Sequence, residues 1–248
     1  MMNKKAWQGY CEAREHFRLL TETLEKELPD LLNWEQQLAQ SRDGPVYQVE
    51  TPVVFNNALD EVTQGSSVRL ILVADNPGRR EQTLENRRYL VGPSGKIAER
   101  FFREHQELGI DFRKNAVILN KTPIHTPRTA ELKELLRLGG PDFAQALIAS
   151  QRKMAELLLE FHHALAPIPV WIIGYSEMRK GGIFEVYTDA IKDLYRGQKK
   201  RRDELFFFRH FSMNQFTVDI SKKRKAGEGI AETLGRIGAA YRERILGF

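Results

Sequence analysis

Four short apolar runs recur along the chain between polar and turn-forming segments, and they predict the strands of a sheet. They are Val68–Ala74, Ala116–Leu119, Pro169–Ile173 and Leu205–Arg209. Runs of this length, rich in branched and aromatic side chains, are typical of buried strands. Because helical patterns lie between them, the alternation favours a parallel sheet covered on both faces. We therefore expect an α/β fold of three layers, α/β/α, with a four-stranded parallel sheet.

Helical spacing of apolar residues marks both ends of the chain. Residues 4–40 carry aromatic and leucine side chains on roughly one face, with a break at Pro29, and Ile230–Ile245 is amphipathic. The other predicted helices span Ser94, an N-cap candidate, to about Glu107, about Ala130–Leu138, and Asp142–His163. Since no repeat or low-complexity linker divides the chain, we expect one domain over 1–248 with an N-terminal helical extension at about 1–45.

Composition narrows the class of protein. The chain has 248 residues, of which 42% are hydrophobic and 29% charged, as in ordinary globular proteins. The single cysteine, Cys11, excludes an internal disulfide, a zinc knuckle and a protein-bound iron–sulfur cluster, so no metal and no cofactor is expected. No apolar run is long enough to span a bilayer, and the charged start has no secretory pattern. We expect a cytoplasmic monomer without membrane contact.

The positive charge is small but clustered. The formal net charge is +5, and two basic runs, Arg196–Arg202 and Lys222–Lys225, flank the strand end at Phe206–Ser212. Most basic runs are solvated loops, but two beside a candidate site favour a polyanion such as nucleic acid. The residues assigned to DNA from this pattern are Lys199, Lys200, Arg201 and Arg202.

Hydrogen-bonding side chains follow three of the four predicted strands. Asn76 lies just beyond the first, Asn120 ends the second and His210 follows the fourth. Right-handed crossovers return parallel strands with the same end up, and ligands of open α/β sheets bind at that carboxyl edge. We therefore predict that these three residues share one sheet edge and line a common cleft.

Several short motifs occur in an order that resembles the uracil-DNA glycosylase superfamily. Ala74-Asp75-Asn76-Pro77-Gly78 is similar to the motif that follows its first strand. Arg88–Gly95 is similar to the Arg-Pro-Phe-Val-Gly segment of its iron–sulfur branch. Val117–Asn120 and His210-Phe211-Ser212 resemble the strand ending in Asn and the His-Pro-Ser motif, and Val53–Leu59 resembles a Tyr-Asn-Pro-Leu segment. The resemblance covers about residues 53–215.

The resemblance implies a DNA glycosylase that hydrolyses the N-glycosidic bond of a flipped-out damaged base, with uracil as the first candidate. Asn76 would orient a water, Asn120 would pair with the base edge, and His210 would donate a hydrogen bond to the 2-oxygen of the departing base. Other residues assigned to the substrate pocket are Asp75, Pro77, Gly78, Tyr89, Leu90, Gly92 and Ser212. Ser94, Lys96 and Met213 are assigned to DNA, Met213 as an apolar wedge in the vacated stack.

Departures from the family pattern keep two alternatives open. Leu90 stands where the family has a stacking aromatic, and together with Asp75 it suggests a pocket for another deaminated base, hypoxanthine or xanthine. Ala74 and Phe211 replace a Gly and a Pro of the motifs, which suggests a non-catalytic nucleic-acid-binding protein on the same fold. The four cluster cysteines of the iron–sulfur branch are absent.

Structural interpretations also exist for each candidate. Asn76 before Pro-Gly is a typical turn residue, Asn120 could bond local backbone groups, and His210 between phenylalanines could be a structural histidine. We interpret His125 as a surface loop histidine and the pair His162-His163 as a helix terminus, not a metal site.

Overall fold

Four parallel strands form the central sheet of the computed structural model, which describes residues 1–41 and 46–248. They are β1 (Leu70–Ala74), β2 (Ala116–Asn120), β3 (Val170–Ile173) and β4 (Leu205–Phe208), in the order β2-β1-β3-β4. Each strand lies within the predicted run or within one residue of it. The predicted parallel sheet is therefore confirmed.

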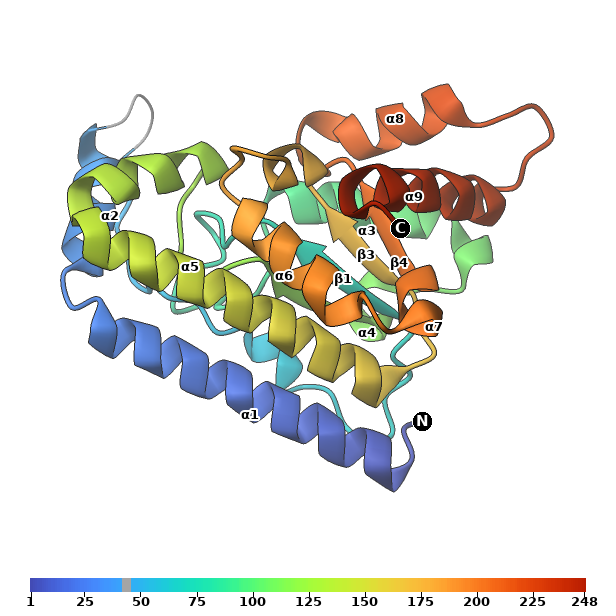
Figure 1. Cartoon of the computed structure of the whole chain (residues 1–248), viewed down its shortest axis with the longest axis horizontal. Helices are drawn as coiled ribbons and strands as arrows, with labels where there is room; N and C mark the ends of the chain where they lie inside the picture. The colour runs from blue at the N-terminus through green and yellow to red at the C-terminus, as the bar shows by residue number, and fades with distance from the viewer. Residues whose placement is uncertain (42–45) are drawn as a thin grey trace.

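Helices cover both faces of the sheet, which gives the three-layer α/β/α arrangement (Figure 1). The helices are α1 (Lys4–Glu27), α2 (Leu31–Ser41), α3 (Pro93–Glu104), α4 (Phe112–Asn115), α5 (Leu132–Leu165), α6 (Glu185–Tyr195), α7 (Lys199–Asp203), α8 (Gln215–Lys223) and α9 (Ile230–Leu246). Short 3₁₀ turns η1 (Asn57–Leu59), η2 (Gln106–Leu108), η3 (Thr129–Glu131), η4 (Tyr175–Met178) and η5 (Ser212–Asn214) connect them.

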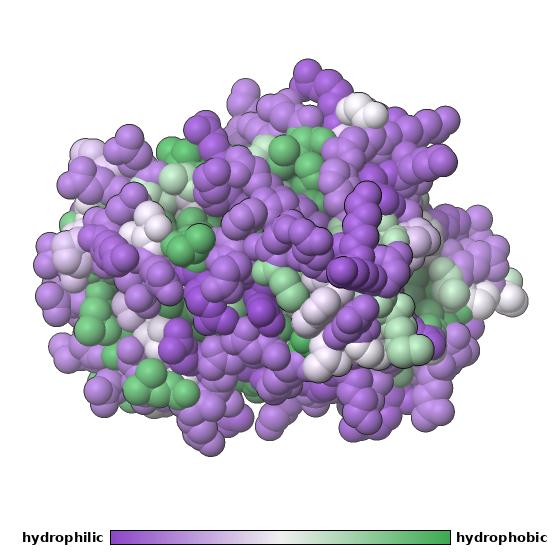
Figure 2. Space-filling model, turned by 90° about the horizontal axis from the view of Figure 1, so that it is seen from below, coloured by the Kyte–Doolittle hydropathy of each residue, from purple (hydrophilic) through white to green (hydrophobic). Residues whose placement is uncertain are grey.

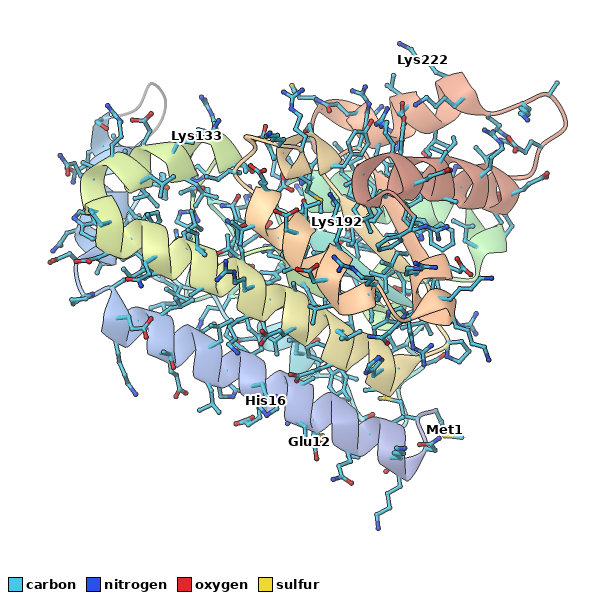
Figure 3. The ribbon with its side chains drawn as sticks, in the orientation of Figure 1. Met1, Glu12, His16, Lys133, Lys192 and Lys222 are labelled. Carbon is cyan, nitrogen blue, oxygen red and sulfur yellow. The ribbon has the colours of Figure 1, made fainter. Side chains whose placement is uncertain are left out.

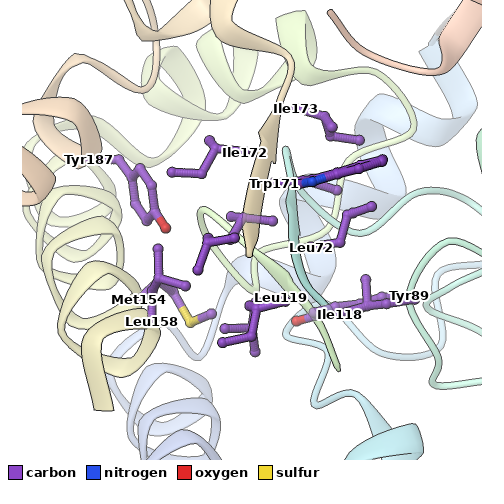
Figure 4. Packing of buried hydrophobic residues seen from close by; sticks show 14 of the residues in the cluster. Leu72, Tyr89, Ile118, Leu119, Met154, Leu158, Trp171, Ile172, Ile173 and Tyr187 are labelled. Atoms are coloured by element: carbon purple, nitrogen blue, oxygen red, sulfur yellow. The ribbon is translucent and has the colours of Figure 1, made fainter. Parts of the chain in front are cut away.

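The two faces of the sheet have different cores because neighbouring residues of β3 point to opposite sides. Ile172 faces Met154 and Leu158 of α5, whereas Trp171 lies on the other side (Figure 4). There the Trp171 ring stacks on Phe102 of α3, with ring centroids 5.3 Å apart. The layer under α5 and α6 thus combines aliphatic side chains with the buried Tyr187 (Figure 4), and aromatic rings form the layer under α3, α8 and α9.

The N-terminal helices pack as a pair against α5. The predicted break at Pro29 separates α1 from α2, since proline cannot continue a helix interior. Gly9 of α1 approaches Ala164 so closely that a Cβ there would lie 3.2 Å from the alanine methyl carbon. The last four residues of the predicted 1–45 extension, 42–45, lie outside the described residues. Seen from below, the molecule is mostly hydrophilic, with small separate apolar areas (Figure 2).

One helix prediction needs correction and another is confirmed. Gly92, not Ser94, is the N-cap of α3, because Pro93 fits the first helical position, where no backbone donor is needed. The two helices predicted at 130–138 and 142–163 are present as two helical segments of α5, because the backbone of Gly140, with φ +57°, is not helical and separates them. Within 1–41 and 46–248, no helix combines the length and the apolar character needed to cross a membrane.

Candidate functional site

The carboxyl edge of the sheet brings together the three strand-end residues predicted from the sequence. Asn120 is the last residue of β2, and Asn76 and His210 lie two residues beyond the ends of β1 and β4. The shared edge is therefore present. A cavity of about 730 Å³ at this edge is lined by His210, η4, α6 and α9, but not by Asn76 or Asn120. The predicted common cleft is not formed by this cavity.

A buried ion pair that the sequence reasoning missed lies at the centre of this edge. Lys121 is completely buried, and its Nζ donates to Asp75 Oδ1 at 2.5 Å and to the Ile173 carbonyl at 2.6 Å. A longer contact of 3.4 Å reaches the Ala74 carbonyl. The ammonium thus connects the ends of β1, β2 and β3. Gly174 leaves room for the carboxylate, since a Cβ there would overlap Asp75 Oδ1.

The sequence did contain a signal for this pair. Ala74 of β1 is paired with Asn120 of β2 in the sheet register, so Asp75 and Lys121 occupy the next position of each chain segment. Opposite charges one residue beyond two adjacent parallel strands are placed to meet. The register of the folded sheet, which aligns Ala74 with Asn120, brings the two charges together.

Hydrogen bonds within the loops hold the Asn76 side chain. Its Nδ2 donates to Thr126 Oγ1 at 2.8 Å and to the Thr126 carbonyl at 3.1 Å. The Thr129 hydroxyl donates to Asn76 Oδ1 at 3.1 Å and contacts Asp75 Oδ2 at 3.3 Å. Because a carbonyl oxygen accepts two hydrogen bonds, Oδ1 keeps capacity for one more donor. Asn76 can therefore hold a water through its oxygen, not through its nitrogen.

Asn120 is a buried amide with no hydrogen bond of standard geometry to the described part of the chain. Only 1% of the residue is exposed, and neither Nδ2 nor Oδ1 has a partner among the described residues. The Tyr89 hydroxyl lies near this amide but donates to the Val54 carbonyl at 2.6 Å. An unsatisfied buried amide costs about 1–3 kcal/mol. The position favours a ligand that supplies the missing donor and acceptor.

The backbone of Leu90 is held in a strained conformation just before α3. Leu90 has φ +54°, which is uncommon for a residue with a side chain. Arg113 Nη2 donates to its carbonyl at 2.7 Å, and the Glu81 carboxylate accepts from its N–H. Gly95 is required here, because a Cβ would overlap the Leu90 carbonyl oxygen. The predicted pocket wall is thus held from both sides, with the Leu90 side chain almost fully buried.

Glu81 is the second functional candidate that the sequence reasoning missed. The residue is 6% exposed, and its carboxylate accepts from the Gly78 N–H at 3.1 Å. Burial raises its pKa to about 7, although the two N–H donors and Arg113 act in the opposite direction. It therefore joins the Pro77-Gly78 turn to the Leu90 clamp.

His210 has one ring nitrogen engaged. The Ser212 N–H donates to Nδ1 at 3.0 Å, so Nδ1 carries no hydrogen and the neutral ring has its hydrogen on Nε2. Burial lowers the pKa of His210; the Asp75 carboxylate acts in the opposite direction, and Lys121 again lowers the pKa. Phe211 is buried against Phe216 with ring centroids 4.5 Å apart.

Met213 is displayed at the tip of the turn that follows His210. It is 82% exposed, and both Met213 and Asn214 have positive φ, +51° and +57°. Two successive left-handed residues reverse the chain and leave the thioether side chain in solvent. This is the geometry that an apolar wedge requires.

The basic runs do not both lie where the sequence suggested. Residues 199–203 form α7, which precedes β4, so Lys199, Lys200, Arg201 and Arg202 lie at the amino edge of the sheet, away from His210. The expectation that this run borders the candidate site is wrong, because four residues of β4 separate it from the carboxyl edge. The run at 222–225 ends α8, and Lys222 projects from that helix (Figure 3).

Two cavities at the carboxyl edge carry other basic residues. One, of about 740 Å³, is lined by Gly78, Gly92 and Ser94 together with Arg79, Arg80 and Arg128. The cavity beside His210 includes Arg179, Lys180, Lys192, Arg209 and Arg244, and Lys192 is seen on α6 in Figure 3. Lys96 is exposed on α3.

His125 is not a surface residue. It is completely buried, and its Nδ1 donates to the Pro77 carbonyl at 2.8 Å, which supports the Asn-Pro-Gly turn. The described residues contain no group of three or more His, Cys, Asp or Glu that could hold a metal ion.

Comparison with known proteins adds no relative. No protein-family model matches this chain, and no curated protein is significantly similar to it. The chemistry of the site therefore rests on its own geometry.

Proposed function

We propose that this protein is a DNA glycosylase that hydrolyses the N-glycosidic bond of a damaged base, with uracil as the first substrate to test. The proposal rests on two groups at the carboxyl edge that follow the two outer strands of the sheet, with β1 and β3 between them. Among the described residues, the Asn120 amide at the end of β2 has no hydrogen bond of standard geometry, and His210 beyond β4 carries an N–H on Nε2. These are the donor and acceptor groups needed to bind an oxo-substituted base.

In the proposed reaction, the C1′–N bond breaks and its electron pair goes to the base. Asn120 pairs with the base edge, and the Nε2–H of His210 donates to the oxygen on which negative charge grows. The free capacity of Asn76 Oδ1 holds the water that forms the new C1′–O bond. The proton that this water releases neutralises the departing base.

The base cannot reach Asn120 without a rearrangement. Asn120 is 1% exposed, so the side chains that cover it have to move when a nucleotide enters. Met213 would fill the space that the flipped nucleotide leaves in the stack.

We further propose DNA as the partner of a monomeric protein, bound along the carboxyl edge by the basic residues of the two cavities. An abasic-site assay tests the function directly. Oligonucleotides carrying uracil, hypoxanthine or xanthine, in single and double strands, are incubated with the protein and then treated with alkali. Scission at the modified base supports the proposal and identifies the base; intact strands with all three bases contradict it.

A non-catalytic nucleic-acid-binding protein is a second candidate because the Asn76 amide nitrogen and the Asp75 carboxylate are already engaged within the fold. Binding to the same oligonucleotides without scission in any of them would favour this candidate over the glycosylase.

A further inference from the structure

The buried ion pair at the carboxyl edge connects three strand ends and the loop that carries Thr129. Lys121 touches three strand ends, and its partner Asp75 lies against Gly174 on one side and Thr129 on the other. A buried ion pair is seldom the most stable choice for a core, since the cost of removing two charges from water offsets their attraction. Its place between Asn76 and His210 suggests that it serves the site.

His210 lies at the strand end next to both charges. Asp75 packs against Gly174, and the Gly174 N–H donates at 3.0 Å to the carbonyl of Phe208, two residues before His210. The carboxylate of Asp75 favours the protonated imidazole, whereas the ammonium of Lys121 disfavours it. Protonation would place a hydrogen on Nδ1, which faces the Ser212 N–H at 3.0 Å, and would thus set two donors against each other. The turn from His210 to Ser212 therefore requires a neutral imidazole, whereas the Asp75 carboxylate by itself favours the protonated imidazole.

We propose that Lys121 is a positioning residue that holds the Asp75 carboxylate and offsets its charge, so that His210 stays neutral with its hydrogen on Nε2. The role of this hydrogen in catalysis rests on the proposed function, but the protonation state is a property of the folded chain. The other charged groups around the His210 cavity come from η4, α6, α9 and the end of β4: Arg179, Lys180, Glu185, Asp189, Lys192, Arg209 and Arg244. They line an open cavity, where solvent screens their charges.

The test is an NMR titration of the imidazole nitrogens in ¹⁵N-histidine-labelled full-length protein, with His210→Gln used to assign the signal. In Lys121→Met the pKa of His210 should rise by about one pH unit, because the carboxylate loses its counter-charge. Lys180→Met removes a lysine from the wall of the same cavity and should leave the titration almost unchanged. An unchanged titration in folded Lys121→Met, or an equal shift in the control, would overturn the proposal.

Lys121→Met leaves a buried carboxylate unpaired and can prevent folding. The double variant Asp75→Asn/Lys121→Met avoids this, since no charge remains at the centre. Its His210 should titrate at or below the pH of the parent protein. A higher titration pH in the double variant contradicts the proposal, because it would show that Asp75 is not the charge that Lys121 offsets.

Measurements of base excision distinguish the role of Lys121 from the proposed glycosylase function. If the protein excises a base, the acid limb of the single-turnover pH–rate profile should shift upward in Lys121→Met along with the imidazole titration. Absence of excision in the parent protein would refute the glycosylase but leave the titration result standing. Normal excision with an unshifted imidazole would refute the role of Lys121 alone.

Discussion

Each end of β4 lies beside a histidine, and the two differ in how their ring nitrogens are used. At the amino end, His162 is completely buried; its Nδ1 contacts the Tyr195 hydroxyl at 3.1 Å and its Nε2 contacts the Glu204 carboxylate at 2.7 Å. At the carboxyl end, His210 accepts from Ser212 and keeps its second nitrogen free of protein partners among the described residues.

A structural polar group differs from one available for chemistry in whether its hydrogen-bonding capacity is used within the fold. Both nitrogens of His162 are satisfied, as stability demands of a buried group. His210 and Asn120 leave hydrogen-bonding capacity unused at the edge where parallel sheets bind ligands. We therefore assign the amino edge to stability and the carboxyl edge to function.

The largest effect is expected for His210→Ala. Loss of one preorganised donor to a growing negative charge should slow the chemical step about 100- to 1,000-fold, while DNA affinity stays nearly unchanged. Single-turnover kinetics with the base that the parent protein excises, together with a binding isotherm, separate the two quantities. Excision at the parent rate would remove His210 from the mechanism.

A pH-dependent loss of stability should follow from Glu81. Its pKa is raised from 4.5 to about 7 in the folded state, so the folded protein binds this proton more tightly than the unfolded chain. The stabilisation is complete below about pH 4.5 and is lost as the pH rises to about 7, which amounts to about 3 kcal/mol.

Glu81→Gln should remove this loss, because an amide oxygen still accepts from Gly78 and cannot ionise. Urea unfolding at pH 5 and pH 8 measures the difference, with the exposed Glu85→Gln as a control. If the parent and Glu81→Gln respond equally to pH, the carboxylate does not contribute as proposed.

His162→Ala tests the other end of β4. It leaves the Tyr195 hydroxyl and the Glu204 carboxylate without their partner and opens a cavity, so the free energy of unfolding should fall by about 2 kcal/mol. The excision rate per folded molecule should stay at the parent value. A loss of excision rate per folded molecule would contradict the assignment of the amino edge to stability.

Asn120→Leu should change stability in the opposite direction. The apolar side chain of similar size removes an unsatisfied amide, so the free energy of unfolding should rise by about 1 kcal/mol while excision is lost. Urea unfolding and the abasic-site assay on one preparation measure both. Lower stability together with full activity would mean that the amide has a partner in the fold and does not read the base.

The smallest effect concerns the basic residues. Arg179→Gln/Lys180→Gln at the carboxyl edge should reduce the slope of log affinity against log salt, by about 0.7 for each phosphate that the variant no longer neutralises on single strands. Lys199→Gln/Lys200→Gln removes the same charge at the amino edge and should leave the slope unchanged. The reverse result would place DNA at the amino edge.

The layers of this protein and the ends of its strands follow from the pattern of apolar runs in the amino-acid sequence. Runs such as Leu70–Ala74 and Ala116–Asn120 are apolar on both sides because helices cover both faces of a parallel sheet, and this pattern is local in the chain. Asn76, Asn120 and His210 were predicted at one edge for a related reason. Each lies at the end of a predicted strand, and parallel strands have their carboxyl ends at the same edge of the sheet.

Which of the residues near those ends meet depends on the folded sheet as a whole. Lys121 reads as an ordinary polar residue in the chain, but three strand ends surround it and bury it completely. Lys199–Arg202 is close to His210 in sequence, yet β4 carries the two to opposite edges. Burial and electrostatic contacts depend on distances across strands, which the register and packing of the whole sheet fix, whereas the strand pattern depends only on neighbours along the chain.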